Sequence, residues 1–332
     1  MLAVNAEEIE LLTRVASLYY LEDATQAEIA AALGLSRPKV ARLLSKARAE
    51  GIVEISIRTH PALNMRLESE LAERFGLSQA ILVADQPSEP LQRALAGRAV
   101  AELLARVLPD EAVVAVGIGR NVGAVPEQLT RAPRRSCTFV SAIGGFAQIG
   151  TDVNSGDACL RLADGFGGRA EILYAPPYAN STESRDAFMQ HSEVRETLAH
   201  AAAAQFAIVG INEVREDGPA VKMGCFSALD MVRMRKAGAV GDILGFFFDV
   251  TGEPVQDSVG ARVVGLDADQ LHAIPQVIAL TSEQGKEHAV LGALRTGIVD
   301  VLVTSLQIAS QVLMLAEGLE QAPRPASSGH RA

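Results

Sequence analysis

The sequence predicts an α/β protein with an N-terminal winged helix-turn-helix and a C-terminal doubly wound domain. At 332 residues the chain is long enough for about two domains. Residues 1–60 contain three helical patterns followed by an alternating, strand-like pattern. From Leu91 onward, apolar strand patterns alternate with amphipathic helical patterns, which is typical of a largely parallel sheet with helices on both faces.

Composition excludes several classes of protein. Hydrophobic residues make up 48% of the chain and charged residues 21%, which indicates a folded globular protein. No apolar run approaches the roughly 18 residues of a membrane-spanning helix. The N-terminal segment MLAVNAEEIELL carries glutamates where a signal peptide has basic residues. We therefore expect a cytoplasmic protein without a membrane partner. Its three cysteines form no C-x-x-C pair, which fits a reducing compartment.

The first two helices have recognisable boundaries. Apolar residues recur at helical spacing and predict a first helix from about Ala6 to Leu21. Thr25 and Glu28 have the spacing of a capping box, in which the hydroxyl and the carboxylate each pair with a free backbone amide. The box opens a short second helix, Gln26–Leu33, and Gly34 suits the positive φ of a helix end.

The third helix and the wing follow directly. Ser36 can cap a helix that tolerates Pro38 in its first turn and runs to about Glu50, where Gly51 stops it. The segment Ile52–Ile57 then alternates apolar and polar residues, which predicts a strand. Three helices, a tight turn before the third and a strand after it make a winged helix-turn-helix.

Charge on the third helix points to nucleic acid. The chain has a net charge of −10, yet the 13 residues from Ser36 to Arg48 contain five basic side chains and no acidic one. The helix has an apolar face (Val40, Leu43, Leu44, Ala47) and an opposite face (Pro38, Arg42, Ser45, Ala49), flanked by Arg37, Lys39 and Lys46. Small and cationic side chains on one face suit a major groove, where Ser and Arg reach base edges and Lys meets phosphates. An exposed basic face on a structural helix is the alternative; the turn and the wing favour DNA.

The domain boundaries follow from these patterns. We expect the winged helix-turn-helix over residues 1–58 and a hinge over 59–90. An amphipathic helix, Met65–Phe75, lies within the hinge and either pairs with a symmetry mate or covers the next domain. The α/β domain over 91–318 and a disordered tail over 319–332 complete the chain.

The strands and helices of the large domain can be assigned in order. The predicted strands are Ala112–Val116, Thr138–Ile143, Ala170–Tyr174, Phe206–Gly210, Ile243–Phe248, Val263–Gly265, Gln276–Leu280 and Asp300–Thr304. The predicted helices between them include Leu91–Leu108, Val194–Gln205, Ala228–Ala237, Gly285–Thr296 and Ser305–Glu317. Several strands are apolar throughout, as a sheet covered on both faces requires.

Ligands of an open α/β sheet bind at the carboxyl ends of its strands. The first such end is the glycine-rich turn that begins at Gly117 and Gly119, where the backbone can approach an anion and Arg120 adds a cation. Its pattern predicts a phosphate site, with a tight turn that binds no ligand as the alternative.

Other strand ends add candidates: Gly144, Asp249 and Lys286. Asp249 can accept hydrogen bonds from sugar hydroxyls or, equally, cap the turn that follows it. Lys286 opens a helix, where a cation is mildly unfavourable unless an anion lies beside it.

Other chemistries are disfavoured. The glycine turn reads G-x-G-x-x-x-G, and the stretch where a ribose-binding acid is expected, residues 134–138, contains none, which argues against a nicotinamide cofactor. The six histidines show no metal-ligand spacing, and no serine lies in a G-x-S-x-G elbow. We therefore expect no cofactor, no metal and no catalytic residues.

Two sets of segments carry a resemblance to one known family. The N-terminal set is Tyr19-Tyr20, Thr25-Gln26, Glu28-Ile29-Ala30, Leu33–Leu44 and Glu50–Val53. The second set is Gly238–Ile243, Phe247–Asp249, the turn over 117–123, Gly285-Lys286 and Val301–Thr304. Together they resemble the SorC-type (DeoR-like) sugar-responsive transcriptional regulators. The resemblance covers roughly residues 8 to 318.

The resemblance implies a phosphosugar-isomerase-like effector domain, a homotetramer on double-stranded operator DNA, and control by a phosphorylated sugar. The expected DNA-binding residues are Tyr20, Gln26, Ser36, Arg37, Pro38, Lys39, Arg42, Ser45 and Lys46. The expected effector-binding residues are Gly117, Gly119, Arg120, Asn121, Gly144, Asp249 and Lys286.

The chain departs from the family pattern at the ligand face. Ile118 and Asn121 replace a tryptophan and a threonine of the glycine turn, and Thr281–Gly285 replaces the Gly-Gly that usually precedes the lysine. Ser305 and Leu306 stand where Asp-Glu often follows the threonine. A free sugar or polyol is therefore an alternative to a sugar phosphate.

Three functions remain to be compared. The first is a repressor-type regulator of a carbohydrate catabolism operon, in which an effector favours one quaternary arrangement over another. The second is a sugar-phosphate isomerase or deaminase with an accessory DNA-binding domain, for which Asp249 is one candidate base without a persuasive second acid/base group. The third is a DNA-binding structural protein without an effector.

Overall fold

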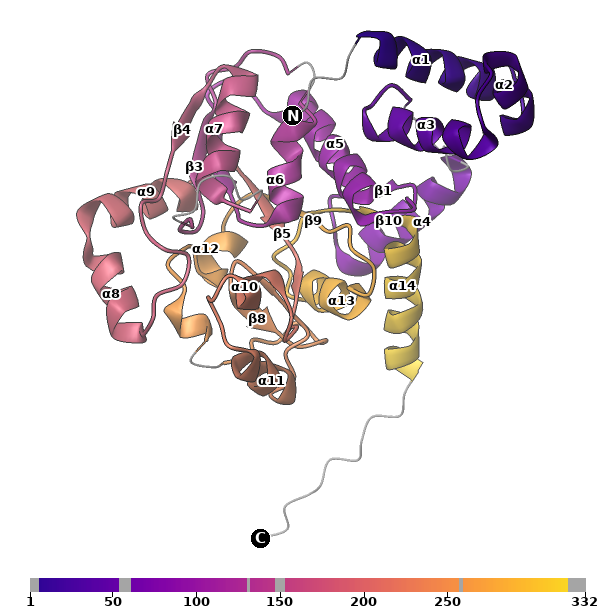
Figure 1. Cartoon of the computed structure of the whole chain (residues 1–332). Coiled ribbons are helices and arrows are strands. Elements are labelled where there is room, and N and C mark those ends of the chain that lie inside the picture. The colour runs from indigo at the N-terminus through magenta and orange to yellow at the C-terminus, as the bar shows by residue number, and fades with distance from the viewer. Residues whose placement is uncertain (1–5, 54–60, 130–131, 147–152, 257–258, 322–332) are drawn as a thin grey trace. The chain divides into compact units, whose positions relative to one another are not determined.

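The protein is described by a computed structural model that covers residues 6–53, 61–129, 132–146, 153–256 and 259–321. It separates into two compact units, Met1–Arg58 and Thr59–Ala332 (Figure 1). No helix among the described residues is both long enough and apolar enough to cross a membrane.

The first unit contains α1 (Ala6–Tyr20), α2 (Gln26–Leu33) and α3 (Arg37–Ala49), close to the predicted helices. The predicted capping box is present: the Thr25 hydroxyl accepts from the Glu28 amide at 3.3 Å, and the Glu28 carboxylate accepts from the Thr25 amide at 2.8 Å. Gly34 ends α2 with φ 65°, a left-handed conformation that glycine adopts without strain.

The apolar faces of these helices meet in one small core. Leu12 and Val15 of α1, Ile29 of α2, and Val40 and Ala47 of α3 are almost fully buried there. Ile52 and Val53 pack against this core, but they are not in a strand. Residues 54–57 of the predicted wing strand lie outside the described residues.

The start of α3 differs from its prediction. Ser36 has the extended backbone of a cap residue, φ −83° and ψ 146°, yet its side chain makes no capping hydrogen bond within the described residues. Pro38 lies at the start of the helix, as predicted, where its missing amide costs nothing.

The second unit is built on a parallel seven-stranded sheet of order β1-β10-β9-β5-β2-β3-β4. Its strands are β1 (Gln79–Val83), β2 (Val113–Val116), β3 (Thr138–Ser141), β4 (Arg169–Glu171), β5 (Phe206–Gly210), β9 (Gln276–Leu280) and β10 (Val301–Ser305). The predicted parallel sheet is confirmed, and β5 and β9 have their predicted bounds. β4 is shorter than predicted.

Helices cover both faces of this sheet. They are α4 (Pro61–Phe75), α5 (Glu89–Val107), α6 (Arg120–Glu127), α7 (Ser155–Phe166), α8 (Thr182–Gln190), α9 (Ser192–Ala202), α10 (Pro219–Lys222), α11 (Ala228–Lys236), α12 (Ala268–His272), α13 (Glu287–Arg295) and α14 (Leu306–Gln321), with a 3₁₀ turn at Gly260–Arg262. α5, α6 and α7 share one core with one face of the strands, and α4, α9, α12, α13 and α14 share the other.

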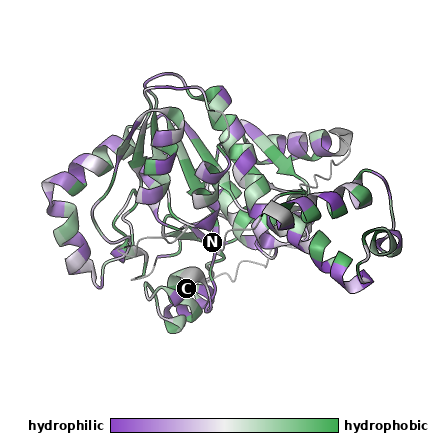
Figure 2. Ribbon diagram, turned by 45° about the horizontal axis from the view of Figure 1, so that its top comes forward, coloured by the Kyte–Doolittle hydropathy of each residue, from purple (hydrophilic) through white to green (hydrophobic). Residues whose placement is uncertain are grey.

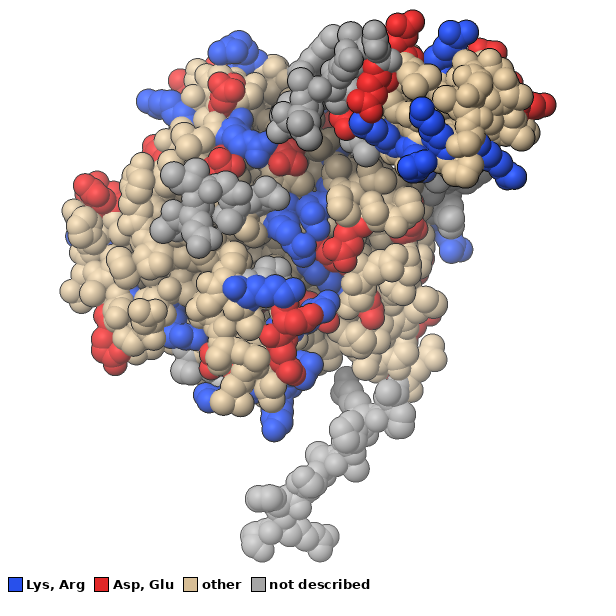
Figure 3. All heavy atoms as spheres, viewed as in Figure 1, with Lys and Arg blue, Asp and Glu red and all other residues tan. Residues whose placement is uncertain are grey.

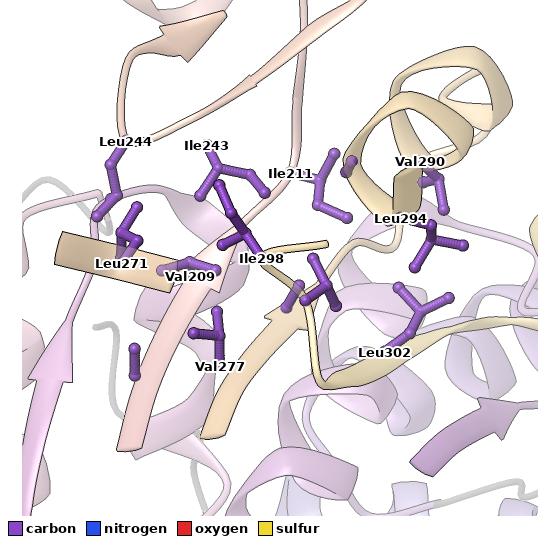
Figure 4. Packing of buried hydrophobic residues seen from close by; sticks show 14 of the residues in the cluster. Val209, Ile211, Ile243, Leu244, Leu271, Val277, Val290, Leu294, Ile298 and Leu302 are labelled. Carbon is purple, nitrogen blue, oxygen red and sulfur yellow. The ribbon is translucent and has the colours of Figure 1, made fainter. Parts of the chain in front are cut away.

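Successive side chains along a strand point alternately into the two cores. Leu302 of β10 faces the core of α13 and α14, whereas its neighbours Val301 and Val303 face the core of α5 to α7. Most strands of the sheet are accordingly coloured hydrophobic in Figure 2, whereas the edge strand β4 has the sequence Arg-Ala-Glu. Figure 4 shows the core that contains α13 and α14. There Val209, Val277 and Leu302 from three strands lie near side chains of α12 and α13.

A small antiparallel sheet replaces one predicted strand. β6 (Asn212–Glu213) pairs with β7 (Gly241–Ile243), which pairs with β8 (Phe246–Phe248). The predicted strand Ile243–Phe248 is thus a hairpin, because Leu244 and Gly245 turn the chain with φ values of 51° and 81°. The predicted strand Val263–Gly265 forms only isolated bridges to Tyr178 and Ile143.

The expected hinge over 59–90 is part of the second unit. β1 pairs in parallel with β10, and α4 buries Leu67 and Leu71 in the main core. Arg74 of α4 pairs with Glu320 of α14 at 2.9 Å. Residues 319–321 of the expected tail are helical, and 322–332 lie outside the described residues.

The two-sided sheet gives a test by core truncation. Leu302 is fully buried in the core of Figure 4, so we expect Leu302→Ala to lower the free energy of unfolding of the second unit by about 2–5 kcal/mol. Urea denaturation followed by circular dichroism measures this loss. Leu160→Ala, at a leucine that is 53% exposed on α7, is the control and should change it by less than about 0.5 kcal/mol. Equal losses in the two variants would contradict the assigned core.

Candidate functional site

The strand order of the large sheet changes direction between β2 and β5. From β2 the chain adds β3 and then β4 on one side, whereas β5, β9 and β10 extend the sheet on the other. Loops that leave neighbouring strands in opposite directions open a crevice at their carboxyl ends, which is where ligands of such sheets bind. A cavity of about 520 Å³ lies at this point, within the size range of small-molecule sites.

The cavity is lined by segments that follow β2, β3, β5 and β9, together with the small antiparallel sheet and α10. Its polar and charged lining includes Arg120, Asn121, Tyr178, Asn212, Glu213, Arg215, Asp217, Asp242, Glu283 and Lys286. Its apolar lining includes Ile118, Phe146, Val153, Met223, Phe226 and Phe247. Such a mixture suits a small ligand with many polar groups and some apolar surface.

The glycine turn after β2 is held by its own backbone. The Gly117 amide donates to the Ile208 carbonyl at 2.8 Å, and the Gly119 amide donates to the Val153 carbonyl at 3.0 Å. Gly119 has φ 119°, which requires glycine, and it leads into α6. Gly119 lines the cavity, whereas a Cβ on Gly117 would lie 3.0 Å from the Ile208 carbonyl oxygen, so Gly117 serves close packing.

A buried carboxylate ties three of these segments together. The Glu283 side chain accepts a hydrogen bond from the Asn121 amide at 2.8 Å and pairs with the Lys286 ammonium at 2.9 Å. Its other oxygen lies 3.5 Å from Arg93 and 3.7 Å from Arg120. Burial alone raises the pKa of Glu283, but the charge of Lys286 and the hydrogen bonds from Asn121 and Lys286 outweigh it and lower this pKa to about 2. Glu283 is therefore an anion at neutral pH.

A second buried carboxylate lies on the small sheet. Asp242 accepts hydrogen bonds from the Gly245 amide at 2.9 Å and from the Asn212 side chain at 3.3 Å. Its pKa is raised by burial, which these hydrogen bonds and the charge of Lys286 only partly offset. Burial, and secondarily the charge of Asp242, also raises the pKa of the Tyr178 hydroxyl, which stays protonated and can donate. Carboxylate, amide and phenol together can bind hydroxyl groups.

An aromatic wall faces these polar groups. The Tyr178 and Phe226 rings lie 4.4 Å apart, edge to face, and Phe226 lies 6.2 Å from Phe247. Such rings supply apolar surface against the C–H faces of a sugar or polyol.

The structure brings four of the seven predicted effector residues to this cavity: Gly119, Arg120, Asn121 and Lys286. Gly117, Gly144 and Asp249 do not line it. A Cβ on Gly144 would come within 2.4 Å of the Ala175 and Pro176 carbonyl oxygens, so that glycine permits a close approach of two loops. The Asp249 carboxylate accepts from the Thr251 hydroxyl and amide and from the Glu253 amide, which makes it the cap of the turn after β8.

Sequence reasoning did not single out Glu283, Asp242 and Asn212. Glu283 follows an apolar strand closely, as Asp249 does, and that signal could have found it. Asp242 and Asn212 come together only because β6 pairs with β7, and no local pattern indicates that pairing.

The predicted DNA-binding face is α3. Val40, Leu43, Leu44 and Ala47 are buried as predicted, and Ser36, Arg37, Pro38, Lys39, Arg42 and Ser45 are exposed. Figure 3 shows Lys and Arg side chains gathered over α3 in the first unit. Tyr20 and Gln26 are half-buried.

One predicted DNA-binding cation of α3, Lys46, already takes part in an ion pair within the protein. It forms an ion pair with Glu8 of α1. The hydrogen bond to Glu8 raises the pKa of Lys46, so this side chain is charged but shared with a carboxylate. Within the described part of the chain, the Arg42 side chain makes one long contact, 3.4 Å, to the Pro38 carbonyl, and the residue is exposed.

Metal chemistry has no candidate in the part of the chain that the structure describes: no group of three or more His, Cys, Asp or Glu side chains there could hold an ion.

Comparison with known proteins identifies both units. Residues 59–314 match the family model "Putative sugar-binding domain", and residues 22–54 match the winged helix-turn-helix DNA-binding model. The transcriptional regulator LsrR of Enterobacter sp. (strain 638) is 31% identical over 313 residues, which cover 93% of this chain and 94% of that protein. The erythritol catabolism regulatory protein EryD of Brucella abortus is 27% identical, over 91% of this chain and 96% of EryD.

Solved structures agree with these matches. The full-length sorbitol operon regulator SorC of Klebsiella pneumoniae superposes with a TM-score of 0.70 at 26% identity, over 93% of this chain and all of that one. The "putative sugar-binding domain of transcriptional repressor" from Vibrio fischeri gives a TM-score of 0.72 at 42% identity, over 76% of this chain and 99% of that one.

These matches confirm the predicted fold class, and they favour a regulator over the isomerase or deaminase alternative. With a winged helix-turn-helix at its N-terminus and a sugar-binding domain behind it, the chain belongs to the SorC-type family of sugar-responsive transcriptional regulators, which are not enzymes.

Proposed function

We propose that this regulator binds its operator through α3 as a cytoplasmic homotetramer, represses a carbohydrate catabolism operon, and releases or retains the operator according to a small carbohydrate in the cavity between β2 and β5. The observation that carries the proposal is the cavity itself. It combines hydroxyl-binding groups with an aromatic wall at the point of the sheet where ligands bind, in a chain that also has a DNA-binding unit.

The exposed face of α3 supports the DNA contact. Arg37, Lys39 and Arg42 lie on the side opposite the buried residues, and Ser45 leaves room between them. Cations at the margins of such a helix can meet phosphates, and Arg42 and Ser45 can reach base edges. Lys46 would exchange Glu8 for a phosphate.

An oligomer follows from the affinity that this contact needs. One helix-turn-helix reads a short half-site, and such proteins gain affinity and specificity by binding two or more half-sites. A homotetramer would meet this requirement, because it carries several DNA-binding units. The proposed location is the cytoplasm, because operator DNA is found there.

The effector is proposed from the cavity and from relatives. Asp242, Asn212, Asn121 and Tyr178 supply carboxylate, amide and phenol groups for hydroxyls. Relatives named for erythritol catabolism and for a sorbitol operon support a polyol or sugar. The effector regulates DNA binding if it favours one arrangement of the oligomer over the other, because a ligand shifts an equilibrium only by its differential affinity.

The DNA-binding helix is tested with Arg42→Ala. We expect operator affinity to fall on the order of 10- to 100-fold, because a base-reading arginine contributes specificity and charge. The measurement is fluorescence anisotropy with a duplex that the wild-type protein selects from a random pool. Arg14→Ala removes an exposed cation from α1 in the same unit and should leave affinity within about twofold. Similar losses of operator affinity in both variants would contradict the prediction that α3 lies in the major groove.

Lys46 is expected to act differently from Arg42. Lys46→Ala should reduce the slope of log affinity against log salt by about one, because a phosphate contact releases about one counterion. Operator titrations at several salt concentrations measure the slope. An unchanged slope would mean that Lys46 stays with Glu8 in the complex.

The effector site is tested with Asp242→Asn. This change keeps an acceptor oxygen for Gly245 and Asn212 but removes the charge, so we expect the effector concentration needed to alter operator binding to rise at least about tenfold. Operator affinity without effector should stay unchanged. Asp249→Asn is the matched control, since Asp249 lies outside the cavity and caps a turn. A response that is lost in Asp249→Asn and retained in Asp242→Asn would reject the assigned cavity.

A further inference from the structure

We propose that Glu283 closes the cationic end of the cavity to anions, so that the effector is an uncharged sugar or polyol and not its phosphate ester. The inference rests on the proposed function, because it names the class of effector for the same cavity.

The position of Glu283 is the first argument. Its side chain is 9% exposed and occupies the place where a ligand anion would be expected, beside Asn121 at the N-terminal end of α6. One carboxylate oxygen accepts a hydrogen bond from the side-chain amide of Asn121 at 2.8 Å and pairs with the Lys286 ammonium at 2.9 Å. The other faces the Arg120 guanidinium at 3.7 Å. The donors that a phosphate would use are therefore turned toward a carboxylate of the chain itself.

The charge of Glu283 is the second argument. With a pKa lowered to about 2, mainly by Lys286 and Asn121, it is ionised at neutral pH. A phosphate brought to Lys286 would lie next to this carboxylate, and like charges at such short range in a partly buried site repel strongly. Displacing Glu283 instead would leave a buried carboxylate without its partners, which is costly.

Lys286 is fixed as well as neutralised. Its ammonium also donates to the Ile211 carbonyl at 3.0 Å, and its side chain is 13% exposed. Two acceptors of the protein thus hold the cation that the family pattern would place against an effector. It serves better as a fixed support for Glu283 than as a mobile phosphate ligand.

The rest of the cavity also fits an uncharged ligand. Among the described residues, four cations line it, Arg120, Arg215, Lys222 and Lys286, against five carboxylates, Glu89, Glu213, Asp217, Asp242 and Glu283. Arg215 is already engaged by Asp217 through two contacts of 2.9 Å. Carboxylates accept hydrogen bonds from hydroxyl groups but repel phosphate, so the lining favours a polyol over its phosphate ester.

Two amides of the glycine turn are not available to an anion. The amides of Gly117 and Gly119 donate to carbonyls within the protein, as described above, and are not turned to the cavity. The cradle of free amides that holds phosphate in glycine-rich loops is thereby reduced.

The test compares free and phosphorylated ligands on the full-length wild-type protein. Isothermal titration uses sorbitol, erythritol, ribose and fructose, the terminal phosphate ester of each, and inorganic phosphate. We expect at least one free compound to bind at least about tenfold more tightly than its ester, and no binding of inorganic phosphate. An ester that binds as tightly as its free form, or more tightly, would overturn the inference while leaving the proposed function intact.

A variant tests the residue itself. Glu283→Gln keeps the shape and an acceptor for Asn121 but removes the charge, so inorganic phosphate and the esters should bind at least about tenfold more tightly than to the wild type. Glu89→Gln removes one charge from the same cavity lining and is the matched control, because the cation beside Glu89, Arg93 at 3.9 Å, does not line the cavity. No gain in Glu283→Gln, or an equal gain in Glu89→Gln, would reject the role of Glu283. If Glu283→Gln does not fold, as judged by circular dichroism, the wild-type comparison decides alone.

Failure of the proposed function gives a different result. In that case no free or phosphorylated carbohydrate binds the wild type, although it still binds its operator, and the inference about Glu283 falls with the effector site.

Discussion

The adjacency of β2 and β5 in the parallel sheet is the constraint on which the site depends. Because the chain builds outward from these two strands in opposite directions, the segments after Val116 and Gly210 diverge and leave a crevice between them. The glycine turn, the small sheet that begins at Asn212, and the loop after β9 all end at this crevice. Residues about 160 positions apart, such as Asn121 and Glu283, become hydrogen-bonding partners only through this arrangement. The cavity is therefore a consequence of topology, and its chemistry is set by the few side chains placed at its edge.

Patterns along the chain predicted the interior of the fold better than its edges. Phe206–Gly210 and Gln276–Leu280 are apolar on both faces and short, and both are strands with the predicted bounds. β1 was missed because Gln79–Val83 pairs only with β10, more than 200 residues later, and its neighbours resemble a linker. The hairpin of β7 and β8 was read as one strand because Ile243–Phe248 is apolar throughout. Leu244 takes a positive φ that a leucine seldom adopts, so Gly245 is the single turn residue in the sequence that marks the break.

The site was predictable to the same degree. Gly119, Arg120, Asn121 and Lys286 directly follow or closely follow strands, and the rule that ligands bind at strand ends places them correctly at the cavity. The same rule misplaced Asp249, because it follows a strand of the small sheet whose end does not face the crevice. Hydrogen bonds from Thr251 and Glu253 show that its carboxylate serves the local turn. Strand ends predict ligand residues only after each strand has been assigned to the right sheet, and pairings such as Asn212 with Asp242 are not visible in local sequence.

A glutamate in the loop after β9 can change effector class without altering the scaffold. The sheet, the two cores and the glycine turn fix where Lys286, Arg120 and Asn121 lie, whichever residue precedes the lysine. A small residue at position 283 would leave these donors open to a ligand anion, whereas Glu283 brings a permanent anion that satisfies them in the absence of ligand. The carboxylate also stabilises the empty cavity, because its cationic and amide donors are paired before any effector arrives. An effector that binds such a preformed cluster has to compete for its hydrogen bonds through hydroxyl groups and not through charge. Selectivity would then come from the number and direction of hydroxyls that Asp242, Asn212 and Tyr178 can meet, and the switch would respond to the shape of a carbohydrate and not to its phosphorylation.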